Sequence, residues 1–165
     1  GADSNMIHNL DSGMNHFADV IYWQYGSNIK DISGAGAAGG IGGGLLAILG
    51  AELKSGTDYI LEKKGFGKMI EGCSLVVTGE GHIDRQTIMQ KAPMGVLRMA
   101  SAHGIPVIAI GGKVTICKEL EDSGFSQILS ITPHSMPLQQ AMEPATAYSN
   151  LFQTAAKLAK SMQNI

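Results

Sequence analysis

The sequence has few cysteines, few charges and no run of like charges, and each shortage excludes a class of protein. Its two cysteines, Cys73 and Cys117, lie far apart and form no CxxC motif. We therefore expect reduced, buried thiols rather than a disulfide framework or a zinc site. Charged residues make up 16% of the chain and the formal net charge is −2, so no nucleic-acid partner is expected. This composition is compatible with a protein that acts on small molecules.

We expect neither a secretory signal nor a membrane span. No stretch has the pattern of a charged segment, an apolar core and a cleavage site. Residues 33–51 carry no charge, but seven of the eleven residues from 34 to 44 are glycine. Glycine adds little hydrophobic transfer energy and destabilises a helix interior by about 1 kcal/mol relative to alanine. We expect no membrane partner and a cytoplasmic protein.

Two common site motifs are missing as well. No GxxxxGK[ST] motif occurs, and the five histidines show no HExxH or HxH spacing. Neither a P-loop nor a histidine metal site is therefore expected.

The order of apolar runs and turn residues predicts an α/β fold with a parallel sheet and helices on both faces, of Rossmann or flavodoxin type. Short apolar runs at 75–77, 107–110 and 128–131 are typical of buried parallel strands. A change of composition near residue 72 separates a glycine-rich helical segment, 1–72, from the sheet region, 73–165. Helices are expected over residues 10–21, 44–49, 57–64, 93–102 and 145–162.

The glycine-rich tract allows three interpretations. Gly34, Gly36 and Gly39 form a GxGxxG pattern, but NIKDIS precedes it instead of an apolar strand, so a dinucleotide-binding oxidoreductase is the least favoured. Glycines spaced four residues apart, such as Gly36 and Gly40, favour close packing of another element on a bare helix surface. Alternatively, backbone N–H groups at a helix N-terminus hold an anion.

The stretch TGEGHIDRQT, residues 78–87, follows an apolar run and is expected to form a turn at the carboxyl end of a strand, where open parallel sheets bind ligands. Positive φ angles at Gly79 and Gly81 would let Glu80 and Asp84 face one pocket. The two carboxylates could bind Mg²⁺, or one could act as a base. The alternative is a solvated turn that Asp84 caps. Side chains nearby that could hold anionic oxygens are Gln86, Thr87 and Lys91.

Four stretches in this order resemble the C-terminal half of the type I glycerate kinases: GAGAAGGIGGGLLAILGAELKSGTDYILE, LVVTGEGHIDRQT, KAPMGV and IPVIAIGG. The resemblance covers most of residues 30–112, with weaker similarity in residues 138–142 and the final helix. It implies an enzyme of two α/β domains around a cleft, which phosphorylates D-glycerate with ATP and Mg²⁺. It also implies that this chain is the C-terminal part of a longer protein and has the N-terminal half as its partner.

The resemblance further implies roles for individual residues. Asp84 would orient or deprotonate the attacking hydroxyl, and Glu80 would contact the metal or the hydroxyl during direct in-line transfer. Two positions depart from the family pattern: Gln90 replaces a usual glycine before Lys91, and His82 replaces a frequent arginine. Groups that would bind substrate or phosphate are the side chains of Gln86, Thr87 and Lys91 and the backbones of Gly34, Gly36, Gly39, Gly40, Gly79 and Gly81.

A second interpretation is a non-catalytic anion-binding, nucleotide-binding or regulatory module that retained the glycine loops. The sequence leaves open the product isomer, 2- or 3-phosphoglycerate, and is compatible with a homo-oligomer.

Overall fold

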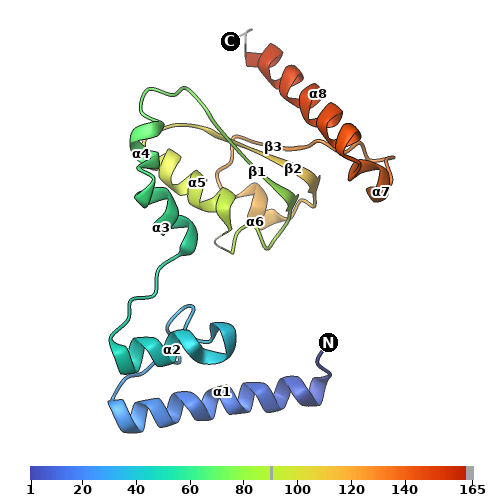
Figure 1. Cartoon of the computed structure of the whole chain (residues 1–165). Coiled ribbons are helices and arrows are strands. Elements are labelled where there is room, and N and C mark those ends of the chain that lie inside the picture. Colours follow the sequence, from blue (N-terminus) through green and yellow to red (C-terminus); the bar gives the residue numbers. More distant parts are fainter. Residues whose placement is uncertain (90, 163–165) are drawn as a thin grey trace. The chain divides into compact units, whose positions relative to one another are not determined.

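The computed structural model describes residues 1–89 and 91–162, so Gln90 lies outside the described residues (Figure 1). The chain divides into two compact units, Gly1–Lys54 and Ser55–Ile165. This boundary lies earlier than the predicted residue 72. The reason is the packing of residues 55–72, since Ile70 and Phe66 belong to the same hydrophobic cluster as the sheet residue Val76.

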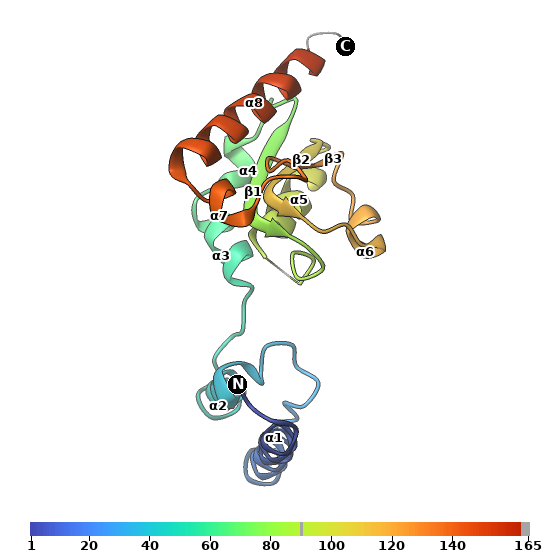
Figure 2. The same cartoon turned by 90° about the vertical axis from the view of Figure 1, so that its right-hand side faces the viewer.

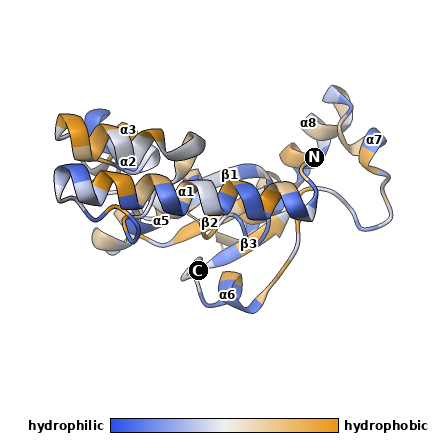
Figure 3. Cartoon of the chain, turned by 90° about the horizontal axis from the view of Figure 1, so that it is seen from below, coloured by the Kyte–Doolittle hydropathy of each residue, from blue (hydrophilic) through white to orange (hydrophobic). Residues whose placement is uncertain are grey.

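The first unit contains α1 (Ser4–Tyr25) and α2 (Ala37–Leu49). Helix α1 begins six residues before the predicted start, because the Asp3 side chain accepts a hydrogen bond from the Met6 N–H at 2.8 Å and caps the first turn. Hydrophobic and hydrophilic residues alternate along α1 (Figure 3). Its buried residues pack with the segment that precedes α2, in a cluster of Ala18, Ile21, Ile29 and Ala35.

The glycine-rich tract is partly left-handed. Ala38, Gly39 and Gly40 have φ angles of 50°, 72° and 87°, so regular helix begins only after them. A Cβ at Gly40 would lie 3.1 Å from the Met14 Cε. A Cβ at Gly43 would lie 2.6 Å from the Ile29 Cδ1. These contacts confirm that glycines of the tract allow close packing. No described strand precedes Gly34, so the frame of a dinucleotide-binding fingerprint is not present.

The second unit holds a parallel sheet of order β1-β2-β3, whose strands lie side by side (Figures 1 and 2). The predicted α/β class with a parallel sheet is therefore confirmed. Its strands are β1 (Val76–Ile83), β2 (Val107–Val114) and β3 (Gln127–Ser130). Its helices are α3 (Gly56–Lys63), α4 (Phe66–Met69), α5 (Ala92–Ala102), α6 (Lys118–Glu121), α7 (Leu138–Ala141) and α8 (Pro144–Met162).

Two hydrophobic clusters fix the sheet. Val76 and Val107, near the amino ends of β1 and β2, pack with Leu97 and Ala100 of α5. A second cluster lies further along the strands and combines Ile83, Ala109 and Leu120. Burial of such side chains stabilises the fold by about 25 cal/mol per Å² of apolar surface. The sheet is therefore anchored at both ends of β1.

Strands β1 and β2 are longer than predicted. The stretch TGEGHI, expected to be a turn, forms most of β1, and the glycine pair at 111–112 lies inside β2. Gly79 and Gly81 do not have positive φ angles, which corrects the prediction. Gly79 instead permits close approach of the neighbouring strand, because a Cβ there would lie 2.7 Å from the Ile110 carbonyl oxygen.

Two further features bear on the predictions. Both cysteines are free, and Cys73 is exposed, so its predicted burial was wrong. Within residues 1–89 and 91–162, no helix is long and apolar enough to cross a membrane.

Candidate functional site

A cluster of polar side chains surrounds Glu80, which projects from β1. The Lys91 ammonium donates a hydrogen bond to Glu80 Oε1 at 2.9 Å, and the Thr87 hydroxyl donates to Oε2 at 3.3 Å. The Glu80 side chain is 17% exposed and Thr87 is fully buried. Both carboxylate oxygens of Glu80 are therefore fixed by partners of complementary polarity.

Asp84 is held by the tight turn that follows β1. Its side chain accepts a hydrogen bond from the Gln86 N–H at 2.8 Å, and its own N–H donates to the Thr87 hydroxyl at 3.1 Å. Thr87 thus connects Glu80 and Asp84 through one oxygen atom. The hydrogen bond to the Gln86 N–H agrees with the capping alternative for Asp84. It leaves the second oxygen, Oδ2, facing His82 Nδ1 at 3.6 Å.

His82 connects this turn to the neighbouring strand. Its Nε2 lies 2.9 Å from the Thr115 hydroxyl, just after β2, while its Nδ1 faces Asp84. Sequence reasoning missed Thr115. The signal that could have found it is the parallel register, since His82 pairs with Lys113 and the residues after β2 come beside the end of β1.

An ion pair joins the same turn to α6. Arg85 lies 3.3 Å from Glu119. The pKa of Glu119 is lowered by a hydrogen bond from its own backbone N–H, by one from the Cys117 thiol and by the charge of Arg85. Both side chains are exposed, so we assign this pair only a small share of the stability.

The structure brings together most of the side chains predicted for the site. Glu80, Asp84, Thr87 and Lys91 form one hydrogen-bonded cluster, whereas the Gln86 side chain makes no hydrogen bond among the described residues. Within that part of the chain no group of three or more metal-binding residues occurs. Mg²⁺ is commonly bound by only one or two carboxylates together with substrate phosphates, and Glu80 and Asp84 are the two carboxylates of this cluster that could hold it.

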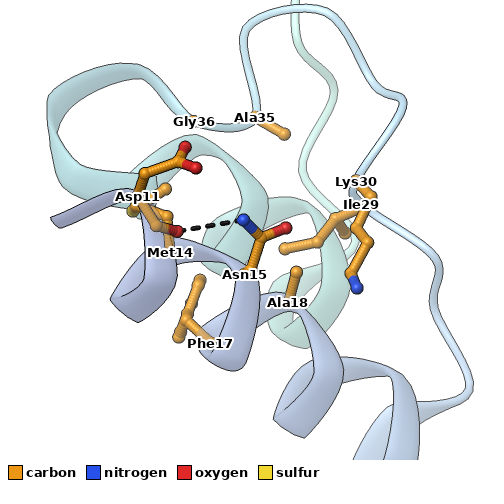
Figure 4. Close-up of a pocket in the computed structure, with 9 residues that line it drawn as sticks. All are labelled: Asp11, Met14, Asn15, Phe17, Ala18, Ile29, Lys30, Ala35 and Gly36. Carbon is orange, nitrogen blue, oxygen red and sulfur yellow. Dashed lines mark hydrogen bonds between the residues drawn. The ribbon is translucent and has the colours of Figure 1, made fainter. Parts of the chain in front are cut away.

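The predicted backbone donors are divided between the two units. Gly79 and Gly81 lie in β1 of the second unit, whereas Gly34, Gly36, Gly39 and Gly40 lie in the first unit, where those that line a pocket do not all line the same one. Gly36 lines a cavity of about 340 Å³ together with Asp11, Asn15 and Lys30 (Figure 4). The Asn15 amide donates a hydrogen bond to the Asp11 backbone carbonyl oxygen at 3.0 Å, and Lys30 pairs with Asp19, which also belongs to α1. This polar lining was not predicted from the sequence. Gly39 and Gly40 line a separate pocket, which is more apolar. That Asp84 and Gly36 contact the same anionic ligand stays a prediction.

The fold and this cluster define an α/β protein with acidic and basic side chains at the carboxyl end of a parallel strand, the usual place for a ligand in such sheets. The model of the glycerate kinase family matches residues 1–163. The chain therefore belongs to the glycerate kinase family.

Individual relatives agree with this assignment. The chain is 40% identical to the glycerate kinase of Bacillus subtilis, over 99% of this chain and 42% of that relative. It is 39% identical to the glycerate 2-kinase of Escherichia coli, over 99% of this chain and 44% of that relative. A crystal structure assigned as glycerate kinase 2 of Salmonella typhimurium matches with a TM-score of 0.65 and 31% identity, over 100% of this chain and 43% of that one. The chain thus spans about two fifths of the length of these relatives.

Proposed function

We propose that this chain is the part of a glycerate kinase that activates the acceptor hydroxyl, in an enzyme that transfers the γ-phosphoryl group of ATP directly to D-glycerate. The observation that carries the proposal is the buried Thr87 hydroxyl, which holds Glu80 and Asp84 in a fixed relation beside Lys91. Phosphoryl transfer depends mainly on positioning and on neutralised charge, so a cluster built this way is chemically adequate.

Each side chain takes a distinct role in this proposal. Asp84 uses Oδ2, which faces His82 but accepts no hydrogen bond within residues 1–89 and 91–162, to orient the hydroxyl of D-glycerate and to accept its proton during in-line attack. Lys91, fixed by Glu80, balances negative charge on the substrate carboxylate or on phosphate oxygens. The Gln86 side chain, which makes no hydrogen bond within the part of the chain that the structure describes, would bind the same oxygens. Mg²⁺, held by Asp84 or Glu80, would neutralise charge on the phosphates.

The proposal extends to parts of the enzyme beyond this chain. We infer that the matched relatives' remaining length supplies the other wall of the active site, as the N-terminal half of a cytoplasmic two-domain protein. We also infer that the three-stranded sheet belongs to a larger Rossmann or flavodoxin-like sheet. Purely parallel sheets are found with both faces covered, and sheets most often have about four to six strands, whereas the sheet of the described residues has three.

A chimera tests the proposed function. The matched segment of the Bacillus subtilis relative is replaced by this chain, and ADP formation is measured with and without D-glycerate. We expect D-glycerate-dependent turnover, and at least a hundredfold loss of kcat in Asp84→Asn, the usual scale for losing a general base. The matched control is Asp122→Asn, an exposed aspartate after α6 that should keep normal turnover. A folded chimera without turnover, or full activity in Asp84→Asn, contradicts the proposal.

A non-catalytic binding module is the second candidate function. The observation in its favour is that hydrogen bonds within the cluster already occupy Asp84 Oδ1 and both carboxylate oxygens of Glu80, which a purely structural cluster would also explain. Calorimetry with the isolated chain separates the two. This alternative would be favoured if the isolated chain bound ATP or D-glycerate while the chimera showed no turnover.

A further inference from the structure

The second unit contains a cavity that neither the acidic cluster nor the glycine tract accounts for. It has a volume of about 740 Å³ and lies at the carboxyl ends of β2 and β3. Small-molecule sites usually occupy about 300–1,000 Å³, and in parallel sheets they lie at this end of the strands. A three-carbon acid such as glycerate would leave most of this volume empty. The cavity therefore suits a larger ligand.

The lining of the cavity is divided between charge and apolar surface. Lys113 and His134 supply nitrogen atoms. Ile116, Ile128 and Leu138 supply apolar surface. A ligand that satisfies both parts carries a flat apolar group and an anionic group, which is the composition of a nucleotide.

Lys113 is available for an anionic ligand. Among residues 1–89 and 91–162, no carboxylate lies within ion-pair distance of its ammonium group, whereas Lys91 is paired with Glu80. A lysine at a strand end without a carboxylate partner gains most from binding phosphate, which it meets as a point charge.

The cavity also adjoins the acidic cluster through the sheet. Lys113 is the register partner of His82, and Thr115, two residues further, contacts the His82 ring at 2.9 Å. A phosphate chain that starts at Lys113 would thus extend along the strand ends toward Asp84. This order places the transferable phosphate on the side of the proposed base.

We propose that this cavity is the nucleotide site, with the adenine ring against Ile116, Ile128 and Leu138 and the phosphates at Lys113. The inference rests on the proposed function, because it takes the Asp84 cluster as the place of transfer. Met136 also lines the cavity, and its sulfur accepts a hydrogen bond from the Asn150 amide of α8 at 3.5 Å. Its methyl group is therefore a fixed reporter inside the site.

The experiment is a titration of the 165-residue chain with ATP, followed by NMR of methionine methyl groups labelled with ¹³C. We expect the Met136 signal to shift on adding ATP and on adding adenosine, while Met6 in the first unit stays unchanged. In Lys113→Ala, ATP should bind about tenfold more weakly and adenosine with unchanged affinity, since only ATP uses the ammonium group; tenfold corresponds to about 1.4 kcal/mol. Lys118→Ala, an exposed lysine of α6, is the matched control and should bind ATP normally.

A second variant addresses the apolar wall. Ile116 is half exposed, so Ile116→Ser should fold normally and weaken adenosine about fivefold through lost apolar contact. Amide spectra of each variant verify the fold.

Three results overturn the proposal. If ATP binds without shifting the Met136 methyl signal, and Lys113→Ala does not change the affinity for ATP, the nucleotide binds elsewhere. Absence of ATP binding at millimolar concentration, in a chain that binds D-glycerate, removes the nucleotide from this chain but leaves the acceptor role intact. If adenosine shifts the Met136 signal but binds Ile116→Ser with unchanged affinity, the adenine ring does not lie against this apolar wall. These results are distinct from a failure of the proposed function, because that function is tested by turnover in the chimera and not by ATP binding.

Discussion

Replacing Thr87 by valine should show how much one buried hydroxyl contributes to the acidic cluster. Valine has nearly the same shape as threonine, so the substitution removes the hydroxyl without opening a cavity. The Asp84 N–H then loses its acceptor at 3.1 Å, and Glu80 Oε2 loses its donor at 3.3 Å. Thr87 is fully buried, and water therefore cannot easily replace these partners.

The size of the effect follows from the two lost contacts. A neutral hydrogen bond contributes about 1 kcal/mol and one to a charged group about 1.5–3 kcal/mol. Because Glu80 keeps its bond to Lys91, we expect the free energy of unfolding to fall by about 2–3 kcal/mol in Thr87→Val. For a small domain this corresponds to a drop in Tm of roughly 10–20 °C. Thr87→Ser keeps the hydroxyl and should lose only about 1 kcal/mol for the missing methyl group.

Urea unfolding followed by circular dichroism measures the stability, and hydrogen exchange of the peptide that contains residues 84–89 localises the change. Exchange in α1, which belongs to the other unit, is the internal control. The hydroxyl would not be the group that holds this cluster in either of two cases: if the free energy of unfolding of Thr87→Val matched that of the wild type within about 0.5 kcal/mol, or if Thr87→Ser were less stable than Thr87→Val.

Three further substitutions test the backbone at positions 79, 81 and 38. Gly79→Ala should lower the free energy of unfolding by about 1–3 kcal/mol, because the new Cβ would lie 2.7 Å from the Ile110 carbonyl oxygen. Gly81→Ala meets nothing within 4 Å, so it should change stability by less than about 1 kcal/mol in the same urea titration. Ala38→Gly should stabilise the first unit by about 1 kcal/mol, since Ala38 has a φ of 50° that glycine adopts without strain; a destabilised variant in thermal unfolding would contradict this reasoning.

The sequence predicted the presence of the strands better than the residues at which they end. Short apolar runs identified all three strands and the parallel class, because buried parallel strands have nearly continuous apolar sequences. The ends of β1 and β2 were wrong because glycine was taken as a turn signal. Gly79 is instead needed where two backbones approach closely, and a single sequence does not reveal which backbone will be its neighbour.

The candidate site shows the same division. Glu80, Asp84, Thr87 and Lys91 are close together in the sequence, so their cluster could be predicted from one motif. Thr115 and the cavity beside Lys113 come from segments far along the chain, which only the register of β1 and β2 brings together. Their detection required the pairing of the strands.

The extended form of β1 changes how the proposed site would work. Had Glu80 and His82 been in a turn, their positions would depend on a loop with few neighbours. As strand residues they are paired with Gly111 and Lys113 across a hydrogen-bonded ladder. Groups held by strands are positioned more precisely than groups held by loops, and in-line phosphoryl transfer is sensitive to errors of about 1 Å. Glycine at position 79 therefore serves the site indirectly, by letting the ladder continue to the residues that carry the charge.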